Sequence, residues 1–244
     1  MCCEKDRTRP GRGRRDRGER RRRMGEIDVG GHQPRAATAL WRFAGAPELP
    51  GTSQLPGWLG RTVLSLVTGY SSPGDRVLLL GPSVSVDDQR LANHPYAAIG
   101  EALWTIVRVG RGVRQARMCD VEVDGFVEGD RVETFDLVIA ACPPSDIGTG
   151  IGVDVARLLN CHGTLVVITH GQATRGVPYG PVAEVVNTLS GRGLGWLDHM
   201  VVESGEMPHP LGAVGLPVRT IHNDVLVFGG PEERAADRSE DSGD

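Results

Sequence analysis

The residues best suited to chemistry form one short run, Cys142-Pro143-Pro144-Ser145-Asp146, which directly follows an apolar segment. That segment, residues 135–141, lacks polar alternation, which predicts a strand buried on both faces, as in a parallel sheet. Proline donates no ladder hydrogen bond, so the strand must stop before Pro143. Ligands of open α/β sheets bind just beyond the carboxyl ends of strands. The run therefore predicts a stiff, ligand-facing loop; the alternative is a rigid turn without function.

The elements that must position this run alternate between apolar strands and helical patterns. This alternation predicts a Rossmann-like, doubly wound, mostly parallel sheet. The last two strands are separated only by a loop, which predicts an antiparallel hairpin at the C-terminal edge. The predicted strands are 76–82, 104–109, a weaker one near 118–123, 135–141, 164–169, 195–203 and 223–228. The predicted helices are 58–70, 88–103, 151–159 and 182–189.

Three further local features carry predictions. Residues 40–43 (LWRF) form a short aromatic anchor, and Asn160 to Gly163 is expected to be a turn with Gly163 as a left-handed cap. Thr169-His170-Gly171 ends a strand and either lines the same edge as Cys142 or is an ordinary polar loop. The glycine-rich segment 148–152 lacks the Lys-Ser/Thr pair of a phosphate-binding loop and is expected to be a flexible lip.

Bulk properties restrict the class of protein. The 244 residues suit one sizeable domain, expected over residues 40–230, between a disordered leader (1–39) and an acidic disordered tail (231–244). No apolar run approaches the roughly 20 residues that cross a bilayer, and the leader lacks a signal-peptide core. The five cysteines are odd in number and form no Cys-x-x-Cys pair, which favours reduced thiols in a cytoplasmic protein. No histidine spacing predicts a metal site.

Charge is unevenly distributed along the chain. Residues 1–23 hold ten arginines and one lysine against four acids, a net +7, whereas the remainder holds 16 basic and 27 acidic residues, a net −11. Nucleic-acid binding depends largely on neutralising phosphates. The acidic body therefore argues against strong DNA binding, and only the arginine-rich leader offers a nucleic-acid contact. Because Met24 follows the leader, translation from either Met1 or Met24 stays open.

Four segments, taken in order, resemble the class I S-adenosylmethionine-dependent methyltransferases, most closely the DNA amino-methyltransferases. They are residues 70–78 (YSSPGDRVL), residues 135–138 (FDLV) with the later Pro143-Pro144, residues 163–167 (GTLVV) and residues 222–228 (HNDVLVF). The resemblance spans about residues 41–229. It implies a Rossmann-like fold and S-adenosylmethionine as cofactor.

The resemblance also places the cofactor-binding positions, and several depart from the family pattern. They are Gly81, Pro82, Ser83, Ser85, Arg108, Gly110 and Asp120. Leu79 and Leu80 stand where the family has Asp-Pro, and serines replace two glycines that allow close backbone approach. Arg108 stands near the position of an acid that holds the ribose hydroxyls, and an arginine accepts no hydrogen bonds. Cofactor binding is therefore expected to be weakened or lost.

The family's catalytic positions are Cys142, Pro143, Pro144, Ser145 and Asp146 here. The family has Asp, Asn or Ser before the prolines, which accepts from the target amine, and an aromatic after them, which stacks on a flipped base. A thiol accepts weakly and Ser145 offers no ring. The prediction is a methyltransferase-like protein with weak or no catalysis. The alternatives are an active methyltransferase acting on a nucleic acid or small-molecule amine, and a non-catalytic interaction or regulatory module. An NAD-type oxidoreductase fits less well, because residues 81–86 lack its glycine pattern.

Overall fold

The computed structural model describes the central part of the chain in segments. These are residues 38–43, 45–82, 94–121, 126–128, 131–143, 155–170, 172–174, 177–179, 181–203 and 222–230. The chain divides into residues 1–35 and residues 36–244, and all described segments belong to the second unit. The predictions for most of the leader, the glycine-rich segment and the acidic tail concern residues outside the described segments and stay predictions.

Seven strands form one mixed sheet with the order β1-β10-β11-β7-β6-β2-β3. Their bounds are β1 Thr38–Arg42, β2 Arg76–Gly81, β3 Gly112–Arg117, β6 Phe135–Ala141, β7 Leu159–His170, β10 Gly195–Glu203 and β11 His222–Gly229. Only β11 runs against its neighbours, because it pairs antiparallel with both β10 and β7 while the other four pairings are parallel. The predicted Rossmann-like class and the C-terminal hairpin are confirmed.

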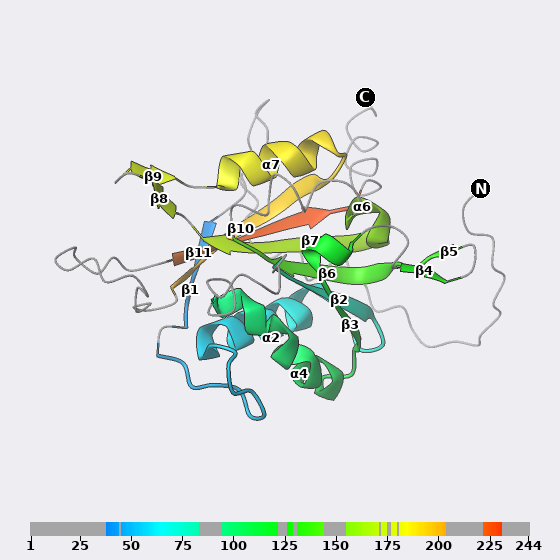
Figure 1. Ribbon diagram of the computed structural model, residues 1–244. Helices are drawn as coiled ribbons and strands as arrows, with labels where there is room; N and C mark the ends of the chain where they lie inside the picture. Colours follow the sequence, from blue (N-terminus) through cyan, green and yellow to red (C-terminus); the bar gives the residue numbers. More distant parts are fainter. Residues whose placement is uncertain are drawn as a thin grey trace, which may run out of the picture. The chain divides into compact units, whose positions relative to one another are not determined.

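Helices cover the two faces of this sheet (Figure 1). One face carries α2 (Gly57–Tyr70), the 3-10 helix η1 (Pro95–Ala102) and α4 (Leu103–Arg108), and the other carries α6 (Val155–Leu158) and α7 (Val182–Gly191). A short 3-10 turn, η2 (Met118–Asp120), follows β3. Two small hairpins stand apart from the sheet, β4 (Val127–Glu128) with β5 (Arg131–Val132), and β8 (Gln172–Thr174) with β9 (Val177–Tyr179). None of the described helices is long and apolar enough to cross a membrane.

Two hydrophobic cores lie on the two faces because successive side chains of a strand point in opposite directions. Strand β2 shows this well: Leu79 packs with α2 and η1, whereas Leu78 and Leu80 pack with α6 and α7. All three leucines are fully buried. The absence of alternation in the sequence thus correctly indicated central strands covered on both faces.

The strand predicted at 104–109 is wrong. These residues belong mostly to helix α4, in which Ile106 is buried while Trp104 and Val107 are 73% and 47% exposed. A strand covered on both faces would bury all three of these side chains, whereas a helix buries only the side chains on one face. The strand that follows β2 is β3, residues 112–117, and the one expected near 118–123 is replaced by η2. As an edge strand with the sequence GVRQAR, β3 carries no apolar run that would reveal it.

The turn predicted from Asn160 to Gly163 is also wrong, because these residues lie inside the long strand β7. Gly163 does not have a positive φ. A Cβ atom there would lie 3.0 Å from the backbone N of Asn160, the Cβ of Leu159 and the carbonyl O of Phe135. The pairing of β6 with β7 shifts register at this point, between Phe135 and Leu137. Close approach of two strands, and not a left-handed cap, therefore explains this glycine.

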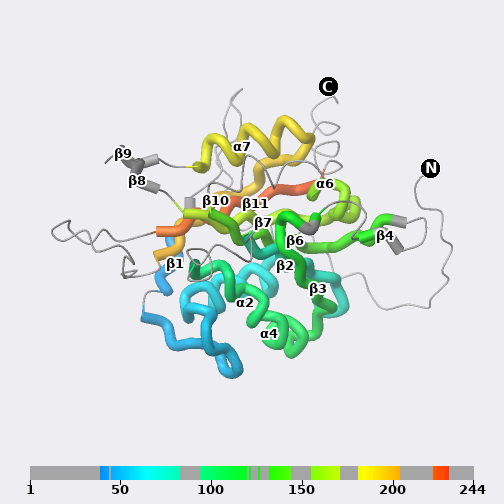
Figure 2. Tube along the Cα trace, in the orientation of Figure 1, coloured from blue at the N-terminus to red at the C-terminus, as the bar shows by residue number. Residues whose placement is uncertain are grey.

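The aromatic anchor at 40–43 is largely a sheet strand, since β1 ends at Arg42. Strand β1 pairs in parallel with β10, so the first and the second-last strands of the sequence lie side by side (Figure 2). The predicted hairpin of β10 and β11 is present, but β1 covers its outer strand. The start of β1 at Thr38 also lies two residues before the expected domain boundary.

Candidate functional site at the carboxyl edge of the sheet

The chain leaves the neighbouring strands β2 and β6 in opposite directions. Strand β2 leads through η1 and α4 on one face to β3, and β6 leads through α6 on the other face to β7. Such a switch point opens a crevice at the carboxyl ends of the two strands, where ligands of open α/β sheets bind. Gly81 ends β2 at this edge and Pro82 follows it, and Cys142 and Pro143 follow β6 to the same edge. The structure thus brings two of the predicted segments together.

The remaining predicted site residues separate into three groups. Asp120 ends η2 just after β3 and so lies toward the same edge. Arg108 ends helix α4, and Gly110 follows in the turn before β3, which places both at the amino edge. There the N–H of Gly74 donates to the carbonyl of Gly110 at 2.7 Å, and Gly110 has a φ of +83°. Arg108 and Gly110 therefore cannot contribute to a site at the carboxyl edge.

The third group of predicted site residues lies outside the described residues. These are Ser83, Ser85, Pro144, Ser145 and Asp146.

Cys142 is fully buried and belongs to the apolar core under α6 and α7. Its backbone N–H donates to the carbonyl of Ile168 at 3.0 Å, which holds it against β7. Pro143 is buried beside it. A fully buried thiol is not exposed to a substrate in solution, so this arrangement favours a packing role for Cys142 over a nucleophilic one.

A group of aromatic side chains, of which the sequence singled out only His170, lies at the same edge. His94 precedes η1, Tyr96 is in its first turn, and His170 is the last residue of β7. The ring centroids lie 4.7 Å apart for His94 and Tyr96, 5.2 Å for His94 and His170, and 5.7 Å for Tyr96 and His170. We call these three side chains the ring cluster.

Asn223 joins the ring cluster from strand β11. It pairs directly with His170 in the antiparallel register, and such partners point to the same face. The hydroxyl of Tyr96 donates to Oδ1 of Asn223 at 2.6 Å, and both residues are buried. Nδ2 of Asn223 is buried and has no hydrogen-bond partner in the described part of the chain. The site therefore contains an unused buried donor.

Burial determines the protonation of the ring cluster. Burial lowers the pKa of His94 to about 4, with a smaller contribution from the neighbouring His170. Burial also lowers the pKa of His170, although the charge of Asp224 acts to raise it. Burial also raises the pKa of Tyr96 well above its usual value, with Cys142 and Asp224 adding to the effect. All three side chains are thus uncharged at neutral pH. The backbone N–H of Tyr96 donates to Nδ1 of His94 at 3.3 Å, so the neutral His94 ring carries its proton on Nε2.

The other face of the same edge carries a second polar group. Asp224 and Thr169 form a register pair, and Oδ1 of Asp224 lies 2.9 Å from Nε2 of His199. Oγ1 of Thr169 is buried without a hydrogen-bond partner among the described residues. No three His, Cys, Asp or Glu side chains in the described segments gather closely enough to hold a metal ion.

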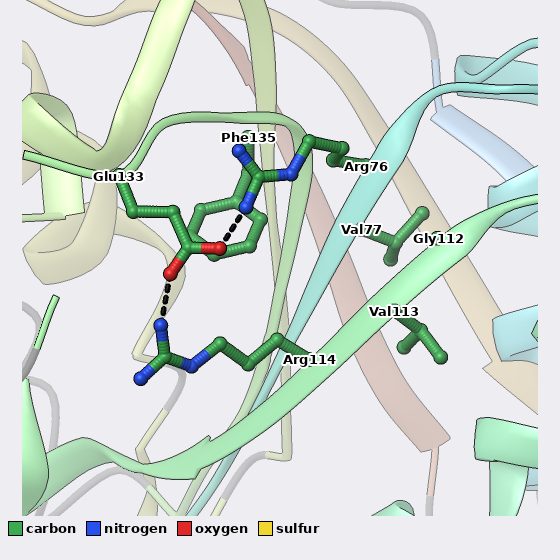
Figure 3. A pocket seen from close by; sticks show the side chains of 7 residues that line it. All are labelled: Arg76, Val77, Gly112, Val113, Arg114, Glu133 and Phe135. Atoms are coloured by element: carbon green, nitrogen blue, oxygen red, sulfur yellow. Dashed lines mark hydrogen bonds and ion pairs between the residues drawn. The ribbon is translucent and has the colours of Figure 1, made fainter. Parts of the chain in front are cut away.

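A cavity of about 320 Å³ lies at the opposite, amino edge (Figure 3). Arg76, Gly112 and Phe135, which line it, are the first residues of β2, β3 and β6. The carboxylate of Glu133 forms ion pairs with both Arg76 and Arg114. The guanidinium of Arg76 lies over the ring of Phe135 at 5.1 Å, and that of Arg114 lies over the ring of Phe126 at 4.7 Å.

These contacts leave the amino-edge cavity without an obvious ligand. The single carboxylate of Glu133 already joins the two arginines, and both guanidiniums rest on aromatic faces. The arrangement holds the segment before β6 against β2 and β3. We therefore assign this cavity a structural role and place the candidate site at the carboxyl edge.

One signal in the sequence pointed toward the ring cluster, and it was not sufficient. Thr169-His170-Gly171 was recognised as the end of a strand, and His170 does lie at the expected edge. His94 and Asn223 lie 76 and 53 residues away in sequence, and only the fold brings them to His170. A buried tyrosine paired with an asparagine has no local sequence signature.

Two positions of strand β2 differ from those with which the resembling family holds S-adenosylmethionine. Leu79 and Leu80, at the family's Asp-Pro positions, are fully buried in the two opposite cores. Strand β3, beside β2, ends in Arg117, and the acid that follows it at this edge is Asp120, three residues later at the end of η2.

Comparisons with known proteins give distant matches to solved structures. No family model matches the sequence, and no curated protein matches it. Among solved structures, an O-methyltransferase from Bacillus cereus in complex with SAH is 11% identical, with a TM-score of 0.37 over 70% of this chain and 80% of that one.

Two further structures are similar to the same degree. The O-methyltransferase TomG from Streptomyces achromogenes, in complex with SAM, is 13% identical with a TM-score of 0.37 over 75% of this chain and 84% of that one. The tRNA methyltransferase TrmK from B. subtilis is 12% identical with a TM-score of 0.36 over 71% and 67%. At these identities and TM-scores the matches carry no conclusion about this chain.

Proposed function

We propose that this chain is a methyltransferase-like protein, related by its motifs to the DNA amino-methyltransferases, that no longer transfers methyl groups. In this proposal the carboxyl edge of the sheet serves to bind a small ligand. The sheet keeps the switch point at which ligands of open α/β folds bind, and polar and aromatic side chains gather there.

The observation that carries the proposal is the burial of Leu79 and Leu80 where a donor-binding segment would begin. Both side chains are fully buried, one in each core, so neither position presents a polar group at the crevice. The position before the prolines is Cys142, whose buried thiol is a poor acceptor for an amine hydrogen. Donor binding and acceptor orientation are thus weakened together.

Calorimetric titration of the full chain with S-adenosylmethionine and S-adenosylhomocysteine tests the proposal. We expect no binding stronger than about 100 μM, which corresponds to about −5.5 kcal/mol. A parallel assay with labelled methyl donor and a duplex containing adenine and cytosine should show no transfer. Micromolar binding, about −8 kcal/mol, or transfer above a heat-denatured sample would overturn it.

A second candidate, an active methyltransferase on a nucleic acid or a small-molecule amine, is favoured by one observation. His94 and His170, at the same edge of the sheet as Cys142, are uncharged at neutral pH. A neutral imidazole near the acceptor position is able to take a proton. The same labelled assay decides, with primary amines added as acceptors: transfer that falls in a His170→Ala variant would establish this candidate.

A further inference from the structure

The ring cluster combines access to solvent with a buried polar group. The rings of His94 and His170 are partly exposed, whereas Tyr96 and Asn223 behind them are buried. The rings come from two separate elements, the start of η1 and the end of β7, and meet at interplanar angles of 34° to 55°. Aromatic rings in this tilted arrangement offer edges and faces to a planar molecule.

Only one of the two polar atoms of the Asn223 carboxamide has a hydrogen-bond partner in the described part of the chain. Its Oδ1 accepts from the hydroxyl of Tyr96 at 2.6 Å. Nδ2 is buried and finds no acceptor among the described residues. A buried donor without a partner lowers the stability of the fold. A ligand that supplies an acceptor would recover this free energy.

The charges around the cluster select against ions. His94, Tyr96 and His170 are uncharged at neutral pH, and the nearest acid, Asp224, lies on the other face of the sheet beside His199. The guanidinium–ring contacts found in the described segments lie at the amino edge, over Phe135 and Phe126. A carboxylate or phosphate would lose its hydration without gaining a cation.

We propose that the ring cluster and Asn223 form a binding site for an uncharged planar ring that bears a hydrogen-bond acceptor, such as a lactam carbonyl. The ring packs against the imidazoles, and its carbonyl accepts from Nδ2 of Asn223. This inference rests on the proposed binding role of the carboxyl edge and specifies the chemical class of the ligand.

The test uses 2-pyridone, a neutral lactam ring, added to the ¹⁵N-labelled full chain and followed by NMR. We expect a dissociation constant of about 1 mM, as for other fragments of this size. The side-chain amide of Asn223 and the imidazoles of His94 and His170 should shift together. Benzene, which lacks the acceptor, should leave the Asn223 amide unmoved, and benzoate should bind about tenfold more weakly.

Two variants make the test specific. Asn223→Ala should weaken 2-pyridone binding about tenfold, whereas Thr169→Val, which removes an unpartnered hydroxyl on the opposite face, should leave it unchanged. If Asn223→Ala does not fold, the three-ligand series on the unaltered chain still decides. Unmoved resonances at 10-fold the expected constant, about 10 mM, or binding of benzoate as tight as that of 2-pyridone, would overturn the inference. Tight S-adenosylmethionine binding would instead contradict the proposed function, so the two failures are distinct.

Discussion

The hydroxyl of Tyr96 donates to Oδ1 of Asn223 at 2.6 Å across 127 residues of sequence. This contact ties the first turn of η1 to strand β11 at the point where the sheet presents its candidate site. Tyr96 is fully buried and its pKa is raised by that burial, so the phenol stays protonated and remains a donor. The hydrogen bond therefore both stabilises the fold and orients the Asn223 carboxamide.

Replacing Tyr96 with phenylalanine should lower the free energy of unfolding by about 1–3 kcal/mol, because Oδ1 of Asn223 would lose its partner in a buried setting. Urea denaturation followed by circular dichroism measures the change. Tyr70→Phe is the matched control: its hydroxyl lies 3.4 Å from Oδ2 of Asp198 in a partly buried position, and we expect a loss of about 0.5 kcal/mol. Equal losses of unfolding free energy in the two variants would contradict the buried hydrogen bond between Tyr96 and Asn223.

Acidification should destabilise the fold through His94. Its pKa is about 4 in the folded protein and near 6.5 when unfolded, so the unfolded chain binds the proton first as pH falls. The contribution of His94 is present above pH 6.5 and declines toward pH 4. Because the ring is partly exposed, we expect about 1–2 kcal/mol over this interval.

The His94→Gln variant removes this titration, so its stability should vary less with pH between 6.5 and 4 than that of the unaltered chain. His162→Gln is the control, because His162 is exposed on β7. Urea midpoints at closely spaced pH values provide the comparison. Parallel pH profiles for the unaltered chain and His94→Gln would contradict the buried, neutral state of this ring.

Patterns confined to one strand were predictable from the sequence, because burial on both faces leaves uninterrupted apolar runs. This explains the success at β2, β6 and β11. Helix α4 was mistaken for a strand because Trp104 and Val107 are large apolar residues that face solvent, so composition suggested burial that the structure does not provide. Strand β1 was missed because a five-residue edge strand, TALWR, has too little periodicity to distinguish it.

Only the strand ends at the candidate site could be predicted from the sequence, because the position of the ring cluster depends on strand register. Pro143 and Gly81 mark strand ends by their own chemistry, so their place at the carboxyl edge followed from local sequence. The edge residues of the ring cluster depend on register: His170 faces Asn223 because β11 pairs antiparallel with β7 in one alignment. Register is a tertiary property, and a slip of one residue would turn Asn223 to the opposite face.

At the amino edge, Glu133 should matter for stability and not for ligand binding. Its carboxylate joins Arg76 and Arg114, and its side chain is only 14% exposed. Glu133→Gln should cost about 1–2 kcal/mol, and the loss should shrink in 1 M salt, which screens the pairs (Debye length about 3 Å). Glu203→Gln is the control, since its pair with Arg42 spans 3.8 Å between exposed side chains. A change in 2-pyridone binding by Glu133→Gln would contradict the structural role.

The close approach of β6 and β7 leads to the last prediction. A methyl group at Gly163 would lie 3.0 Å from the N of Asn160 and the carbonyl O of Phe135, both backbone atoms that cannot rotate away. Gly163→Ala should therefore lower the unfolding free energy by about 1–3 kcal/mol. Gly191→Ala, at the end of α7 with open space around its Cβ position, should leave stability unchanged or slightly raised. Thermal and urea unfolding of the two variants measure the difference, and a Gly163→Ala protein as stable as Gly191→Ala would show that the strands separate at little cost.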